Sequence, residues 1–159
     1  MPGTVDSLNA AMAAGVVPYG EGPYRLEMRQ RVYAQMLADA QEHLKNGRSV
    51  VLDASFSRLK WRRDALQLAA DLSTNFLLVE CRCSEETMRK RLLKRDDESG
   101  FSQARVHHLP QMKKAFEPVE ELPVEQHIAV DTDQPFLTVL DDILKQGYAR
   151  KSMQISAVL

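Results

Sequence analysis

The sequence predicts an α/β fold in which a parallel sheet carries helices on both faces, as three layers. Three short aliphatic runs with strand character, at residues 49–54, 75–81 and 127–132, are separated by amphipathic stretches long enough for helices. Strands that alternate with helices of this length are typical of parallel sheets joined by crossover helices. The 159 residues, 44% hydrophobic and 27% charged, are enough for one domain with a proper core.

In the first half of the chain, each expected element follows from its residue types. Residues 1–24 are rich in small residues, glycine and proline, so we expect loop there. From Glu27 to Leu44 apolar side chains recur every four residues, which predicts an amphipathic helix. The Asn-Gly pair at 46–47 is typical of a helix C-terminus. The aliphatic run from Ser49 to Ala54 predicts a buried strand with an acid, Asp53, at its far end.

The second half continues the alternation. In order, we expect a helix at 59–72, a strand at 75–81, a helix from a Ser84 cap to Asp97, a helix at 103–116 interrupted at Pro110, a strand at 127–132 and a helix at 135–146. We therefore divide the chain into a loop-rich segment (1–24), one domain (25–148) and a loosely ordered tail (149–159). About three strands make a thin sheet for this class.

Composition excludes several classes of protein. The net charge of −1 gives no general attraction to nucleic acids or acidic membranes, and no run is long enough to cross a bilayer. Cys81 and Cys83 form no disulfide framework, so we expect a reduced, cytoplasmic protein. The four histidines lack the spacing of metal ligands, and Trp61 is expected to be a half-exposed helix residue.

Asp53 is the first candidate site residue. It ends the predicted strand, with the hydroxyl residue Ser55 two positions later. Ligands of open α/β sheets bind beyond the carboxyl ends of the strands, and an Asp there commonly holds Mg²⁺ or its water in nucleotide-handling enzymes. The alternative is that Asp53 only caps a helix or turn.

Two arginines form the second candidate. Arg91 and Arg95 lie four residues apart on one face of the predicted helix at 84–97. The planar guanidinium is well suited to bind phosphate, although a solvated basic face is the common alternative. Nucleic-acid binding by this helix is less favoured, because acidic residues follow it at once and it contains no aromatic residue.

Four segments of the chain, taken in their order, resemble those of a known family. They are GRSVVLDASFSRLKWRRDALQLA, FLLVECRCSEETMRKRLLKR, SQARVHHLPQMKKAFEP and IAVDTDQP. Together they resemble the P-loop kinase domain of zeta-toxin-like and small-molecule kinases, over about Tyr19 to Gln146. The family's strand-end Asp-Ala-Thr-Phe is matched by residues 53–56, its helix arginine by Arg62, and its lid Arg-x-x-x-Arg by Arg91 and Arg95. Further matches are Ser102 with Ala104, and Val130 to Thr132.

The resemblance implies roles for these residues. Asp53 would orient Mg²⁺ or its water, with Ser55 beside it in the cofactor site. Arg91 and Arg95 would close over the transferred phosphoryl group, and Arg62 would serve the substrate or the structure, or be a plain surface charge. The implied cofactors are ATP and Mg²⁺, and the implied partner is a small-molecule phosphoryl acceptor.

The family's strongest motif is missing. No Gly-x-x-x-x-Gly-Lys-Ser/Thr occurs, and Gly15 to Gly20 is rejected because Glu21 and Gly22 follow it. We therefore expect a truncated P-loop NTPase-like fold that begins after the family's first strand, phosphate loop and second strand. This argues against ATP binding and catalysis by the chain as written.

Two hypotheses remain open. The chain is part of an ATP-dependent small-molecule kinase, or it is a non-catalytic binding or regulatory module on a kinase scaffold. Because the missing first strand is central in that fold, we expect one of two arrangements. Either the two flanking strands pair directly, or the place is taken by residues 8–17, by a missing N-terminal segment or by a second copy of the chain in a homodimer.

Overall fold

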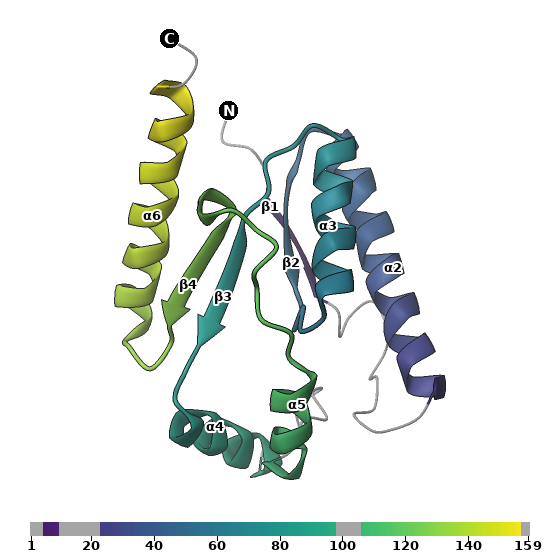
Figure 1. Cartoon of the computed structure of the whole chain (residues 1–159), viewed down its shortest axis with the longest axis vertical. Helices are drawn as coiled ribbons and strands as arrows, with labels where there is room; N and C mark the ends of the chain where they lie inside the picture. Colours follow the sequence, from purple (N-terminus) through teal and green to yellow (C-terminus); the bar gives the residue numbers. More distant parts are fainter. Residues whose placement is uncertain (1–4, 10–22, 98–105, 157–159) are drawn as a thin grey trace. The chain divides into compact units, whose positions relative to one another are not determined.

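The computed structural model describes residues 5–9, 23–97 and 106–156 of the chain (Figure 1). Its elements are β1 (Val5–Asn9), α2 (Pro23–Lys45), β2 (Ser49–Asp53), α3 (Leu59–Asp71), β3 (Leu78–Arg82), α4 (Glu85–Asp97), the 3₁₀ turn η1 (Val106–His108), α5 (Leu109–Ala115), the 3₁₀ turn η2 (Val124–Gln126), β4 (His127–Asp131) and α6 (Phe136–Ser156). None of the described helices is long and apolar enough to cross a membrane.

The strands form two parallel pairs. β1 pairs with β2, so that Asn9 lies opposite Asp53, and β3 pairs with β4, so that Arg82 lies opposite Asp131. The predicted α/β class with parallel pairing is confirmed. The described residues contain four strands in two sheets, however, and not about three strands in one sheet.

The additional strand is β1, in the segment that we expected to be loop. Its sequence, VDSLN, contains Asp and Asn, which strands generally disfavour, and it shows no apolar alternation. Its five residues are paired with the whole of β2. Backbone hydrogen bonds to a neighbouring strand have therefore outweighed local propensity. The other candidates for the missing strand's place, residues 10–17, lie outside the described residues, as does the rejected glycine segment.

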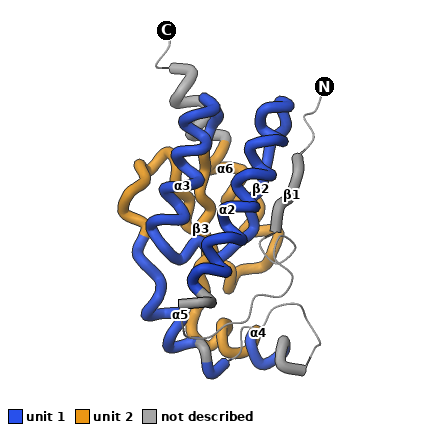
Figure 2. Tube along the Cα trace, turned by 90° about the vertical axis from the view of Figure 1, so that its right-hand side faces the viewer, with its two compact units in different colours: residues 1–75, 92–118 blue, residues 76–91, 119–159 orange. Residues whose placement is uncertain are grey.

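The chain forms two compact units (Figure 2). Unit 1 comprises residues 1–75 and 92–118, and unit 2 comprises residues 76–91 and 119–159. Each unit contains one of the two sheets. The division expected from composition, with boundaries after residues 24 and 148, remains a prediction.

Two helices of unit 1 end in the same way. Gly47, at φ 72°, follows α2, and its N–H and that of Arg48 donate to the carbonyls of Leu44 and His43. This is a Schellman cap, as the Asn-Gly pair predicts. After α3, Ser73 takes the left-handed position at φ 53° with the equivalent bonds, although it is not glycine. That second cap has no clear sequence pattern.

The core of unit 1 is built where α2 and α3 carry their apolar side chains. Met36 is fully buried, and Tyr33 and Trp61 are 6% and 4% exposed, so the expectation of a half-exposed Trp61 is wrong. The rings of Tyr33 and Trp61 stack, with centroids 4.2 Å apart and planes 9° apart. The aromatic partner on another element explains the burial, and the sequence around Trp61 does not reveal it.

The core of unit 2 centres on β4. Ile128 and Val130 alternate as buried residues, while Ala129 between them is exposed. α6 packs against β4 and continues to Ser156, beyond the expected end at Gln146. From its apolar spacing we expect five residues of this helix to be buried: Phe136, Val139, Leu140, Ile143 and Leu144. Val139 and Ile143 are half-buried, but Phe136, Leu140 and Leu144 are exposed, as is Leu137, so the expectation is partly wrong. A two-stranded sheet is too narrow to cover the whole apolar surface of a helix.

Candidate functional site

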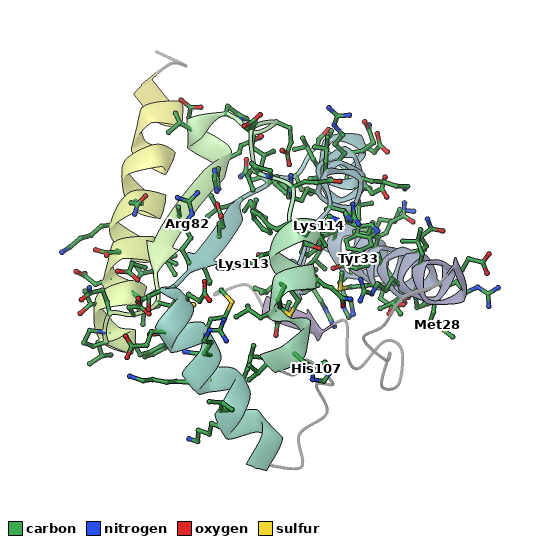
Figure 3. The ribbon with its side chains drawn as sticks, turned by 60° about the horizontal axis from the view of Figure 1, so that its bottom comes forward. Met28, Tyr33, Arg82, His107, Lys113 and Lys114 are labelled. Atoms are coloured by element: carbon green, nitrogen blue, oxygen red, sulfur yellow. The ribbon has the colours of Figure 1, made fainter. Side chains whose placement is uncertain are left out.

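Asp53 lies where the sequence predicts it, at the carboxyl end of β2. The predicted burial of this strand is wrong, since no residue of β2 is buried and Val51 is 51% exposed. Asp53 is exposed, and the loop of residues 54–58 leads from it to α3. In that loop Ser55 is exposed, and its hydroxyl lies 3.2 Å from the hydroxyl of Tyr33, which projects from α2 (Figure 3). The strand therefore presents a carboxylate and a hydroxyl at its end, close in sequence. Among the described residues there is no cluster of three or more side chains suited to bind a metal ion.

Phe56, in the same loop, has an unusual backbone. Its φ of 40° is in the left-handed region, which costs a residue with a side chain about 1–2 kcal/mol. Its N–H donates to the Tyr33 hydroxyl at 3.2 Å, and its carbonyl accepts from Nη1 of Arg62 at 3.0 Å. Its ring is buried edge-on against Tyr33, with the centroids 5.3 Å apart. Side chains of two helices thus hold a conformation that the loop alone would not favour.

Arg62 is buried, with 1% of its surface exposed. Nη1 donates to the carbonyl of Phe56, and Nη2 donates to the carbonyl of Pro118 at 3.0 Å. The alternative of a plain surface charge is therefore wrong. Burial of a guanidinium is tolerated only when it has hydrogen-bond partners, and here two backbone carbonyls are among them. The suggested role in substrate binding remains a prediction.

Glu117 completes this arrangement, and we did not single it out from the sequence. Its carboxylate accepts the Leu59 N–H at 2.5 Å and Nη1 of Arg58 at 3.1 Å. Its own N–H donates to the carbonyl of Ser57 at 2.8 Å. The Leu59 N–H, followed by Arg58, lowers the pKa of the Glu117 carboxyl. Arg58, the N-cap residue of α3, makes no side-chain cap. The helix is capped instead by Glu117, which lies 58 positions after Leu59, so no local pattern could indicate this cap.

Arg91 lies in unit 2, where its guanidinium is bonded to the turn after β4. Nη1 donates to Oγ1 of Thr132 at 2.9 Å, and Nη2 donates to the Thr132 carbonyl. Thr132 in turn donates its N–H and its hydroxyl to the carbonyl of Arg82, at 2.7 and 2.9 Å. Arg91 therefore ties α4 to the ends of β3 and β4. Arg95 lies in α4, but its side chain is outside the described residues.

The N-terminus of α4 is occupied by side chains of the chain itself. The Ser84 hydroxyl accepts the Thr87 N–H at 3.2 Å, which confirms the predicted cap. The Asp133 carboxylate accepts the Ser84 N–H at 2.8 Å, and hydrogen bonds from Thr87 and then Ser84 lower the pKa of this carboxyl. The positive end of the helix dipole therefore already has a carboxylate next to it.

The contacts of Arg91 make a testable prediction. Arg91→Ala is expected to lower the free energy of unfolding by about 0.5–1.5 kcal/mol, because hydrogen bonds to Thr132 are lost at an exposed position. Urea unfolding followed by far-UV circular dichroism measures the change. Lys90→Ala is the control, since its ion pair with Glu86 is exposed on both sides. Equal, negligible effects of both substitutions would show that the Thr132 contact does not stabilise the fold.

A charged cluster lies on β3 and β4, formed by Glu80 within β3, Arg82 at its end and His127 at the start of β4. The Glu80 carboxylate accepts Nε and Nη2 of Arg82, at 3.0 and 2.8 Å, and lies 2.9 Å from Nε2 of His127. The Arg82 hydrogen bond, ahead of the smaller contribution of His127, lowers the pKa of Glu80. These groups satisfy one another, so we assign the cluster to the packing of the sheet.

Comparison with known proteins now identifies the family. Residues 5–119 match the family model described as AAA domain. The chain belongs to this family. The AAA domain is similar in structure to a gluconokinase from Sinorhizobium meliloti 1021, with a TM-score of 0.59 and 18% sequence identity over 98% of this chain and 97% of that chain. No curated protein matches the sequence. Family and fold together confirm a P-loop kinase-like domain.

The residues of this AAA domain fit the implied cofactors only in part. Asp53 supplies one hard oxygen ligand at a strand end, which suits Mg²⁺. A triphosphate needs a cradle of backbone N–H groups followed by a lysine, and the sequence contains no such motif. Of the predicted residues, Asp53, Ser55 and Arg62 belong to unit 1, whereas Arg91 belongs to unit 2. The sequence therefore supplies an acid for the implied ATP and Mg²⁺ site but no phosphate-loop motif.

Proposed function

We propose that this AAA domain is the acid-bearing part of an ATP-dependent small-molecule phosphotransferase. One observation carries the proposal: in a P-loop kinase-like fold, the exposed carboxylate of Asp53 lies at the carboxyl end of a parallel strand. Enzymes of this type act almost entirely by positioning the reactants and neutralising charge. Asp53 would orient Mg²⁺ or its water, with Ser55 beside it. Arg91 and Arg95 would neutralise charge on the transferred group.

The 159 residues are proposed to be inactive by themselves. They contain no glycine-rich phosphate loop, so a loop from a longer polypeptide or from another chain is required. Arg91 would contact a phosphoryl group with the N–H groups that it does not donate to Thr132. The acceptor is proposed to be a small hydroxyl compound, and the likeness to a gluconokinase makes gluconate one member of the panel to be tested. The free thiols of Cys81 and Cys83 support the prediction of a cytoplasmic location.

The first experiment compares two forms of the protein. The 159-residue chain, mixed with ATP, Mg²⁺ and a panel of sugar acids, polyols and amino sugars, is expected to transfer no phosphate. The intact mass of the protein from its native cells is expected to exceed 18.0 kDa and to include a Gly-x-x-x-x-Gly-Lys segment. This longer form should phosphorylate one acceptor, and Asp53→Asn should lower its kcat by about 100-fold or more.

The control for Asp53 is Asp71→Asn, at the end of α3 and away from the strand ends. It is expected to leave kcat unchanged. A longer form that transfers phosphate equally well with Asn at position 53 would remove Asp53 from the reaction. A native mass of 18.0 kDa without transferase activity in any complex would overturn the proposal.

The second candidate function is a non-catalytic binding or regulatory module. The observation that favours this function is that each sheet has an unpaired strand edge. In the described residues, β2 and β3 each pair with only one strand. Such edges can accept a strand from another polypeptide or from a second copy. Light scattering would reveal a homodimer, and a native mass of 18.0 kDa with a stable partner would favour this function over the first.

A further inference from the structure

The β2–α3 loop (residues 54–58) is held by groups that are distant in sequence. Its backbone contacts involve the Tyr33 hydroxyl from α2, the Arg62 guanidinium from α3 and Glu117 from the segment after α5. Figure 3 shows Tyr33 on α2. All of these residues belong to unit 1.

Three backbone groups of Phe56 and Ser57 are bonded to groups outside the loop. The Phe56 N–H donates to the Tyr33 hydroxyl, and the Phe56 carbonyl accepts from Arg62, so both of its backbone groups are bonded to side chains. The carbonyl of Ser57, the next residue, accepts the Glu117 N–H at 2.8 Å. Leu59, the first residue of α3, donates to the Glu117 carboxylate. Non-local contacts therefore fix the path of the chain from the strand to the helix.

We propose that Tyr33, Arg62 and Glu117 are positioning residues that hold the β2–α3 loop, and with it Asp53 and Ser55, in one conformation before any ligand binds. The part of this inference that concerns ligands rests on the proposed function. The part that concerns the loop rests on the contacts alone. None of the three residues is proposed to contact a substrate.

The backbone of Phe56 explains why such support is required. At φ 40° a residue with a side chain is in a sparsely populated conformation, and such a residue persists only when its surroundings determine it. The buried ring of Phe56 anchors the residue, but a ring contact does not set the orientation of its peptide groups. The hydrogen bonds to Tyr33 and Arg62 set the orientation of these peptide groups. Without these hydrogen bonds the loop would relax, and Ser55, which follows the paired end of β2, would lose its fixed position.

Tyr33→Phe separates positioning from packing. The substitution keeps the ring that stacks on Trp61 and removes only the hydroxyl that contacts Phe56 and Ser55. We expect the Phe56 amide to exchange with deuterium at least about tenfold faster, whereas amides of β3 and β4 keep their wild-type rates. Trp61 is the only tryptophan, so an unchanged fluorescence spectrum would verify that the stack is intact.

Glu117 is tested by a pair of variants. Glu117→Ala removes the acceptor for the Leu59 N–H, so the protection of that amide should fall at least about tenfold. Glu117→Gln keeps an acceptor oxygen and should restore part of the protection. Glu125→Gln, an exposed glutamate in η2 of the other unit, is the matched control and should change nothing.

The pH dependence of amide protection distinguishes a hydrogen bond to the Glu117 carboxylate from simple packing of its side chain. The Leu59 N–H, followed by Arg58 and then Arg62, favours the charged form of the Glu117 carboxylate, so its pKa is lowered. The protection of the Leu59 amide, corrected for intrinsic exchange, should be complete above the pKa of an unfolded glutamate. It should be lost as the pH falls through the lowered pKa of Glu117. Glu117→Gln should show no such step.

The outcomes distinguish this inference from the proposed function. Wild-type protection in both Tyr33→Phe and Glu117→Ala would overturn the inference, as would a loss of protection spread equally over both units. Either result can be obtained from the 159-residue chain without nucleotide. Failure of the longer form to transfer phosphate would overturn the proposed function and leave the exchange results standing.

Discussion

Replacing Arg62 with methionine is expected to lower the free energy of unfolding by about 3 kcal/mol. Methionine fills a similar volume but donates no hydrogen bond, so the carbonyls of Phe56 and Pro118 lose the guanidinium inside the protein. An unsatisfied buried acceptor costs about 1–3 kcal/mol, and two are affected here. Urea unfolding followed by the fluorescence of Trp61, the neighbouring residue, measures the change.

Arg63→Met is the matched control for this prediction. Arg63 is the next residue of α3 but is exposed, so its replacement should alter the free energy of unfolding by no more than about 0.5 kcal/mol. If both variants unfolded at the same urea concentration, the buried contacts of Arg62 would contribute nothing to stability. The inference that Arg62 positions the β2–α3 loop would then also lose its energetic basis.

Replacing Ile128 with alanine is expected to have an effect of similar size in unit 2. Ile128 is fully buried in β4, and removal of its side chain loses transfer free energy and leaves a cavity. For a large aliphatic residue changed to alanine, these contributions together amount to about 2–5 kcal/mol. Urea unfolding followed by far-UV circular dichroism is the measurement, since Trp61 belongs to unit 1.

Val124→Ala provides the comparison in unit 2. Val124 is 70% exposed in η2, close to β4 in sequence, and its truncation should cost at most about 0.5 kcal/mol. A small effect of Ile128→Ala, comparable with that of Val124→Ala, would mean that the β3–β4 sheet has no well-packed core. It would also weaken the assignment of Arg91 to the support of this sheet, because Arg91 bonds to the turn at its end.

The positions of Asp53 and Arg91 bear on the proposed reaction in different ways. Asp53 is exposed at a strand end, where a ligand can approach it. Arg91 donates two of its five N–H groups to Thr132, so a phosphoryl group would be contacted by the remaining N–H groups. The same arginine can thus stabilise the fold and neutralise charge, but not with the same hydrogen bonds at once. The proposed lack of activity of the 159 residues rests on the absence of a phosphate-loop motif from the sequence.

Much of the candidate site could be predicted from local sequence. The aliphatic run before Asp53 predicted the strand, because alternation and β-branched residues act over a few neighbouring positions. The Ser84 cap and the Gly47 cap were predicted for the same reason. The order of the motifs, including the one at residues 53–56, predicted the P-loop kinase-like domain that the family match confirms.

What the sequence by itself determined is therefore the class of fold, the ends of most helices and the place of Asp53 at the end of β2. Only the tertiary structure decided that VDSLN is a strand, that Arg62 and Trp61 are buried and that Glu117 caps α3. The physical reason is the range of the contacts. Helix caps and aliphatic runs depend on residues a few positions apart. The pairing of Val5 with Ser49, the bond of Arg62 to Pro118 and the bond of Leu59 to Glu117 join residues 44, 56 and 58 positions apart, which no local pattern specifies.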